Sequence, residues 1–323
     1  MALELEQLEA VTTDYWKKKD LTDIYFTENV LLWKLLGNGN MENFYVKGSD
    51  LVDGGTMIRK FLEYAKANSG SYGNTTTIPV GKVPIVNAAR FRWAAYYASN
   101  TIDFDERRQN SGGAQLVDLV YTKMKNIEKT IRDTMGAAIY ASAADGNSFL
   151  GLGNLFSTVT ATSYGSIAED DMSAWAAETL SAGRAISFLA LQEIWREAAI
   201  GQSSKAKPNI AITTEALKDG YERTLQTQQR FSDVALVNAG FENILFKGAP
   251  VIGDDNQASG TLDALNLRHM WIQTHKDFNF TEPKWRNTVG KPDTFTADTR
   301  WSGQLTTNHR AAHCRETGLT EPT

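Results

Sequence analysis

The chain has 323 residues, of which 42% are hydrophobic and 22% are charged, and its formal net charge is −5. This balance is typical of a folded globular protein with room for two or three lobes, and it argues against a disordered chain or a dedicated nucleic-acid groove. The single cysteine, Cys314, excludes an intramolecular disulfide framework, and the lack of any apolar run of about 18 residues predicts no membrane-spanning helix.

The first third of the chain predicts an arm followed by a long β-hairpin. Residues 1–12 alternate leucine with glutamate and have neither the basic start nor the apolar centre of a signal peptide. Two β-rich segments, 56–64 and 90–104, enclose the polar stretch 68–84. This layout predicts a hairpin with a mobile tip at 69–77. Because small and polar residues cannot bury a core, we expect the hairpin to lie on a neighbouring molecule.

The next segment has the clearest periodicity in the chain. Its apolar residues recur at steps of three or four, which places them on one stripe of an amphipathic helix. They are Leu116, Leu119, Val120, Met124, Ile127, Ile131, Met135, Ala138 and Ile139. A helix of roughly 30 residues is about 45 Å long, close to the diameter of a small domain. Few catalytic domains need such a strut, whereas a protein that tiles a surface does.

The second half of the chain places helices and strands in separate blocks. A helix is expected over 187–199, a buried strand over 208–213 and a second helix that begins after Thr214 as its N-cap. A strand, a turn and a second strand are expected over 246–252, and the sequence is β-rich from 265 onward. Because the blocks do not alternate as βαβ units, the expected fold class is α+β.

Few side chains have the spacing of a catalytic or metal site. His309 and His313 are four residues apart, and Cys314 follows directly, so on a helix they could form part of a metal site. A helical metalloprotease motif would need glutamate beside the first histidine, where Arg310 stands. We therefore expect no metal, no cofactor and no catalytic residue in this chain.

Other chemistry-bearing residues are interpreted as structural. His269 and His275 are expected to flank a strand at 270–272 as polar partners. The acidic clusters at 103–106, 169–171 and 254–255 lack the spacing of a calcium loop and are interpreted as solvated loops or intersubunit salt bridges. The glycine pairs at 37 and 39 and at 151 and 153 lack the third glycine of a dinucleotide-binding turn.

The order of these segments resembles the major capsid proteins of tailed bacteriophages, which share the Hong Kong 97-type capsid fold. The motifs that carry the resemblance are Gly151-Leu152, Ser163-Tyr164-Gly165-Ser166-Ile167 and Trp175 after the long helix; Pro208 to Thr214 with Tyr221; Gly240 to Val251 with Asp254-Asp255; and Asn308-His309-Arg310 with Thr317-Gly318-Leu319. The resemblance covers about residues 54–319. Ser166 departs from it, because the family commonly has glycine at this position.

The resemblance implies an α+β chain with a long spine helix, an extended β-hairpin called the E-loop, a peripheral domain and an axial domain. The implied boundaries are an N-terminal arm over 1–53, the E-loop over 54–108, the peripheral domain over 109–185 and 264–323 with its spine helix over 112–144, and the axial domain over 186–263. The chain has no long helical N-terminal extension that could act as a built-in scaffold. A separate scaffolding protein is therefore expected.

The function implied by the resemblance is structural, without catalysis. The chain would be the major capsid protein of a tailed double-stranded DNA bacteriophage, assembling in the host bacterial cytoplasm as hexamers and pentamers into the icosahedral shell of the virion. Its implied partners are further copies of itself, a portal protein, a scaffolding protein, a decoration protein and packaged DNA held by non-specific proximity, with no membrane. Two alternatives stay open: an encapsulin-like nanocompartment shell and a soluble metal-dependent enzyme.

Intersubunit contacts are expected at aromatic and basic residues of the hairpin and of the segment before the long helix. The candidates are Arg59, Lys60, Phe61, Phe91, Trp93, Arg107 and Arg108. The resemblance also marks Tyr164, Gly165 and Trp175 as the loop that defines the fold.

Overall fold

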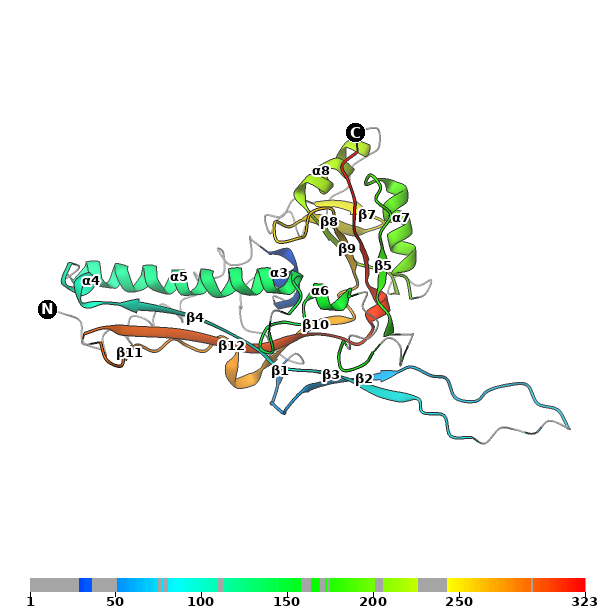
Figure 1. Ribbon diagram of the computed structural model, residues 1–323, viewed down its shortest axis with the longest axis horizontal. Helices are drawn as coiled ribbons and strands as arrows, with labels where there is room; N and C mark the ends of the chain where they lie inside the picture. The colour runs from blue at the N-terminus through cyan, green and yellow to red at the C-terminus, as the bar shows by residue number, and fades with distance from the viewer. Residues whose placement is uncertain are drawn as a thin grey trace.

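The computed structural model describes residues 29–36, 51–74, 77, 81–109, 113–143, 145–157, 164–168, 172, 175–200, 206–225, 243–291 and 293–322. They form an elongated molecule with three parts: a rod-like half, an upright lobe and a hairpin that projects away from both (Figure 1). No helix in these ranges is both long and apolar enough to span a membrane.

A long helix and a five-stranded sheet form the rod-like half (Figure 1). The helix, α5 (Gly113–Tyr140), lies along β4 and β12. Strand β10 pairs with β1 on one side and β12 on the other, β11 pairs with the start of β12, and β4 runs antiparallel to β12. The strands are β1 (Leu51–Val52), β4 (Ala94–Ile102), β10 (Met270–His275), β11 (Arg286–Asn287) and β12 (Phe295–Thr307).

The apolar stripe of α5 is buried as its periodicity predicts. Its members with 1% exposure or less are Val120, Met124, Ile127, Ile131, Met135 and Ile139. Leu119 and Ala138 flank the stripe and are partly buried. Each fully buried aliphatic side chain of this size contributes about 1.5–3 kcal/mol, so the stripe fixes the helix on the sheet. The predicted long helix is confirmed, but it ends at Tyr140 and not at the predicted residue 144.

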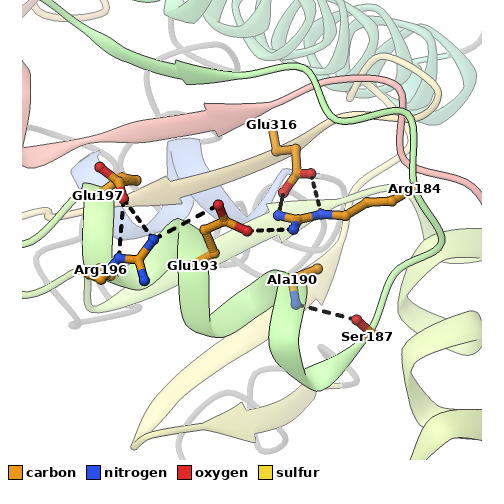
Figure 2. Close-up of polar contacts among 7 residues, drawn as sticks. All are labelled: Arg184, Ser187, Ala190, Glu193, Arg196, Glu197 and Glu316. Atoms are coloured by element: carbon orange, nitrogen blue, oxygen red, sulfur yellow. Dashed lines mark hydrogen bonds and ion pairs between the residues drawn. The ribbon is translucent and has the colours of Figure 1, made fainter.

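The upright lobe is built on a six-stranded sheet with the order β5, β13, β9, β6, β8, β7. Helices α7 (Phe188–Glu197) and α8 (Glu215–Thr224) pack on it. Ser187 caps α7 by accepting a hydrogen bond from the Ala190 N–H (Figure 2). Thr214 occupies the N-cap of α8 without a side-chain hydrogen bond. The strands are β5 (Glu178–Leu180), β6 (Ile210–Thr213), β7 (Asn243–Phe246), β8 (Ala249–Gly253), β9 (Leu262–Leu265) and β13 (Cys314–Glu316).

An ion-pair network fastens the C-terminal strand of this lobe to α7 (Figure 2). The carboxylate of Glu316, on β13, is fully buried and accepts hydrogen bonds from Arg184 Nε at 2.8 Å and Nη2 at 3.0 Å. Arg184 also donates to Glu193 on α7, and this contact lowers the pKa of Glu193. At the surface, Arg196 pairs with Glu197 and Glu193. One guanidinium therefore joins the chain before α7, the helix and the last strand.

The predicted domain boundaries differ from the observed sheets. They place β5 and β13 in the peripheral domain, yet both strands belong to the six-stranded sheet, where β13 pairs with β5 and β9. The reason is burial: Cys314 and Leu319 lie in the core of the lobe, so the chain crosses back into it near its C-terminus. The predicted N-terminal arm also contains α3 (Val30–Leu36), which is buried against β10 and does not reach outward. Residues 1–28 and 37–50 lie outside the described residues.

The hairpin pairs β2 (Ile58–Glu63) with β3 (Val86–Phe91). The predicted second strand, 90–104, is therefore wrong as a single element. Its first residues complete β3, and after Arg92 and Trp93 the chain enters the rod as β4. The physical cause is the burial of β4 at steps of four, with Ala94, Ala98 and Ile102 covered, which ties this strand to the sheet and not to the hairpin.

Candidate intersubunit interface

The loop after the spine helix fastens the base of the hairpin. The Arg90 N–H donates to the Gly165 carbonyl at 2.7 Å, and the Ser166 hydroxyl donates to the Arg90 carbonyl at 3.2 Å. Gly165 has a φ of +63°, and a Cβ atom there would come within 3.1 Å of the Ala89 and Phe91 side chains. A glycine is required because the loop lies directly on β3 in a left-handed conformation. Ser166 adopts the next left-handed position with a φ of +61°.

Tyr164 and Trp175 hold this loop from behind. The indole N–H of Trp175 donates to the Tyr164 carbonyl at 2.9 Å, and the two rings stack with centroids 6.4 Å apart. The Arg310 guanidinium lies 5.3 Å from the centroid of the Tyr164 ring. Burial raises the pKa of the Tyr164 hydroxyl, which stays neutral. The structure thus brings Tyr164, Gly165 and Trp175 together against the hairpin base.

Two of the expected contact residues serve this anchoring within the subunit. Phe91 is fully buried and meets the edge of Tyr164 at a centroid distance of 5.5 Å. Trp93 donates its indole N–H to the Gly55 carbonyl at 2.7 Å and packs edge-on against His275. The expectation that Phe91 contacts a neighbour is therefore wrong. Trp93 anchors the turn before β2 and is only partly buried, so its contact with a neighbour stays a prediction. Alternation in the sequence could not tell which face of the hairpin is covered.

The outer face of the hairpin, defined as Arg59, Phe61, Val86 and Arg90, is apolar and basic, with the exposed Glu63 at its edge opposite Val86. Phe61 is 76% exposed and Val86 is 64% exposed. Arg59 and Arg90 stand directly opposite each other across the two strands. Like charges in this position repel, and neither guanidinium has a carboxylate partner among the described residues. This face can bind a partner that carries an apolar surface and carboxylates.

The other face of the hairpin points to the body of the molecule. Lys60 lies on it, with its ammonium 4.4 Å from the centroid of the Trp271 ring on β10. This cation–π contact is made within the subunit. Lys60 is only partly buried, so its contact with a neighbour stays a prediction. Sequence analysis missed Val86 and Arg90 as outer-face residues. Alternation places both opposite to Ala89 and Phe91, but only the burial of those two residues in the structure shows which face is outer.

The remaining candidates lie on α4 (Phe104–Gln109), at the opposite end of the molecule from the hairpin (Figure 1). Arg107 is mostly covered and lies over the Phe295 ring at 4.8 Å. Arg108 is exposed and pairs with Asp105 at 3.2 Å. Of Arg107 and Arg108, only Arg108 has an exposed guanidinium that a neighbouring copy can reach.

No group of three or more histidine, cysteine or carboxylate side chains is placed to hold a metal ion within the described ranges. His309 and His313 do not share a helix face, because the chain between them forms a short 3-10 turn, η6 (Arg310–Ala312). His275 ends β10 and His269 directly precedes it, as predicted.

No protein-family model and no curated protein matches this chain. Solved structures do match it. A chain of the cyanophage A-1(L) capsid superposes with a TM-score of 0.60 at 15% identity, covering 82% of this chain and 88% of that one. The Hong Kong 97-type capsid fold accounts for this match and for the geometry above. The chain has the Hong Kong 97-type capsid fold.

Two further structures of this fold are similar to the chain. In the head of Helicobacter pylori bacteriophage KHP40, the match has a TM-score of 0.54 at 8% identity, covering 85% and 86% of the two chains. In the holo-SrpI encapsulin complex from Synechococcus elongatus, it has a TM-score of 0.53 at 10% identity, covering 73% and 78%. Within the Hong Kong 97-type fold, α5 is the spine helix and the β2–β3 hairpin is the E-loop. The predicted α+β class is confirmed.

Proposed function

We propose that this chain is the major capsid protein of a tailed double-stranded DNA bacteriophage, and that it assembles as hexamers and pentamers into an icosahedral shell. One observation carries the proposal. In a chain with a capsid fold, the rigidly anchored E-loop holds an exposed phenylalanine beside two opposed arginines. An exposed apolar patch with unpaired charge is typical of a surface that binds another protein.

The shape of the molecule supports a head-to-tail contact. The E-loop and α4 lie at opposite ends of its long axis (Figure 1). A contact between the outer face of one copy and a different surface of the next is heterologous, and such contacts close into rings when the rotation permits. Each contact can be weak, because many repeated contacts in a closed shell act together.

The further partners belong to the same proposal. A portal protein, a separate scaffolding protein and a decoration protein would complete the virion, and assembly would take place in the host bacterial cytoplasm. The net charge of −5 supports a container that encloses DNA without binding it tightly. The role requires no catalysis and no cofactor.

A nanocompartment shell is the second candidate function, supported by the similarity to the encapsulin complex. That match covers 73% of the chain with a TM-score of 0.53, against 82% and 0.60 for the cyanophage capsid, which favours the phage shell. The content of particles purified from their natural source separates the two functions. A phage shell encloses double-stranded DNA and carries a portal, whereas a nanocompartment encloses a cargo enzyme.

Alanine substitutions at Phe61 and Leu62 separate assembly from folding. These neighbours lie on opposite faces of β2, with Phe61 76% exposed and Leu62 6% exposed. We expect Phe61→Ala to change the free energy of unfolding by less than about 0.5 kcal/mol and to reduce particle yield strongly. Leu62→Ala should lower the free energy of unfolding by about 2–4 kcal/mol, because it empties a buried position.

Particle yield by velocity sedimentation and stability by urea unfolding measure the two effects. Equal particle yields from Phe61→Ala and the unmodified chain would show that the outer face does not contribute to assembly.

A further inference from the structure

The two sheets of the molecule are joined by a short crossing near the C-terminus. The five-stranded sheet ends there with β12 at Thr307, and the six-stranded sheet resumes with β13 at Cys314. Three histidines gather around this crossing from two parts of the chain. His269 precedes β10, and His309 and His313 flank η6. None of them has a role in the proposed assembly.

His313 bonds to both sheets at once. Its ring is fully buried, and its Nδ1 accepts a hydrogen bond from the Asn266 N–H at 3.1 Å, directly after β9. Its Nε2 lies 3.4 Å from the Thr307 hydroxyl oxygen at the end of β12. That hydroxyl donates its own proton to the His269 carbonyl at 2.6 Å, so it accepts from His313 Nε2–H. The neutral ring with its proton on Nε2 therefore links the two sheets.

A second proton on this ring would break the link. It would have to bind at Nδ1, where the Asn266 N–H already donates, and two donors would then face each other. The carboxylates on the two flanking strands are held elsewhere: Asp263 on β9 by Arg315, and Glu316 on β13 by Arg184. Among the residues that the structure describes, the buried imidazolium would have no counter-ion.

The surroundings add positive charge to the same crossing. The rings of His269 and His309 meet edge-on at a centroid distance of 5.7 Å, and His269 Nδ1 lies 2.9 Å from the Asn308 side-chain oxygen. The guanidinium of Arg310, also buried, bonds to the Leu155 carbonyl. A charge on His309 therefore opposes a charge on His313, because no carboxylate among the described residues pairs with either ring.

The direction of the pH effect follows from these contacts. Burial, with the neighbouring histidines, lowers the pKa of His313 to about 3, and burial and His269 lower the pKa of His309. In the released, solvated state a histidine has a pKa of about 6.5. The link is therefore intact above about pH 6.5 and is weakened progressively as the pH falls toward 3, because the released state binds the proton and the linked state does not.

We propose that His313 is an acid-sensitive tie between the two sheets, whose protonation opens the crossing between the end of β9 and the end of β12. The proposal concerns a single subunit and does not depend on shell formation. Release of the tie is local, since the ends of β9 and β12 would no longer share a side chain while the apolar core that contains residues of both sheets stays packed.

Hydrogen exchange of the full chain and of His313→Asn tests the tie. An asparagine oxygen can still accept from the Asn266 N–H, but it does not take up a proton. At pH 7.5 His313→Asn should exchange at least as fast as the unmodified chain, because it lacks the ring N–H that donates to Thr307. Between pH 7.5 and pH 4.5, exchange in peptides covering 262–268 and 305–313 should rise roughly tenfold or more in the unmodified chain relative to the variant, because one linked proton changes the opening equilibrium by up to about tenfold per pH unit. Comparison at equal pH cancels the intrinsic pH dependence of exchange.

His275→Asn is the matched control, because His275 accepts only the nearby Asp277 N–H outside the crossing. It should keep the acid response of the unmodified chain. The proposal would be overturned if the ratio of the exchange rates of the unmodified chain and His313→Asn were the same at the two pH values.

If His313→Asn does not fold, an NMR titration of the unmodified chain with labelled histidine decides the question. Release must coincide with proton uptake by His313, and release while its ring stays neutral would also overturn the proposal.

Discussion

Replacing Arg184 with alanine is expected to lower the free energy of unfolding by about 3–5 kcal/mol, because it leaves a buried carboxylate without its partner. The Glu316 side chain is fully buried and both of its oxygens accept from this one guanidinium (Figure 2). The hydrogen bonds to Glu316 and Glu193 raise the pKa of Arg184, so its guanidinium stays charged at neutral pH. The effect should be large because β13 joins β5 to the rest of its sheet.

Arg196→Ala is the matched control for this prediction. Arg196 also pairs with two glutamates, but its side chain is 73% exposed (Figure 2). Surface pairs contribute about 0–1 kcal/mol, so its loss should be near the limit of detection. Urea unfolding followed by circular dichroism measures both variants. Equal, small losses from the two variants would mean that solvent reaches Glu316 and that the network does not hold β13.

Replacing Gly151 with alanine is the second large effect, with an expected loss of about 3 kcal/mol, at the upper end of overpacking costs. Gly151 begins the turn into α6 (Leu152–Leu155) and lies against the last turn of the spine helix. A Cβ atom there would come within 2.4 Å of the Ala141 carbonyl and 2.6 Å of the Ile139 carbonyl. Backbone atoms cannot rotate away as a side chain does, so the helix end or the loop must shift.

Gly146→Ala provides the comparison, since no atom lies within 4 Å of the position its Cβ would take. Its free energy of unfolding should change by less than about 0.5 kcal/mol. Thermal and urea unfolding of both variants give the difference directly. A loss below about 1 kcal/mol for Gly151→Ala would show that the loop does not approach the spine helix as closely as described. The glycine pair at 151 and 153, unexplained by any nucleotide-binding motif, thus has a packing role.

The spine helix was predictable from sequence because every turn repeats the same apolar stripe. The hairpin was predictable in kind but not in register. Alternation alone cannot separate β3 from β4, which differ only in which neighbour covers them. For the same reason Phe91 resembled Phe61 in the sequence, although one is buried and the other exposed. The local sequence pattern shows that a side chain is apolar, but only the tertiary packing determines whether it is buried inside the subunit or exposed.

Contacts between residues far apart in the sequence could not be predicted from local patterns. The return of β13 to the upright lobe buries Cys314 and Leu319 and brings Glu316 to Arg184, a residue 132 positions earlier in the chain. The link through His313 depends on Asn266 and on a tautomer fixed by Thr307. Spacing along the chain suggested only a weak metal motif for His309 and His313. Their actual roles follow from the crossing between two sheets, which no local pattern records.

Electron microscopy of the purified full-length chain tests the central claim most directly. The account predicts closed icosahedral particles built of hexamers and pentamers, alone or with the scaffolding protein supplied, in which the outer face at Phe61 lies on a neighbouring copy. A chain that stays strictly monomeric at high concentration, with the scaffolding protein present, would contradict it.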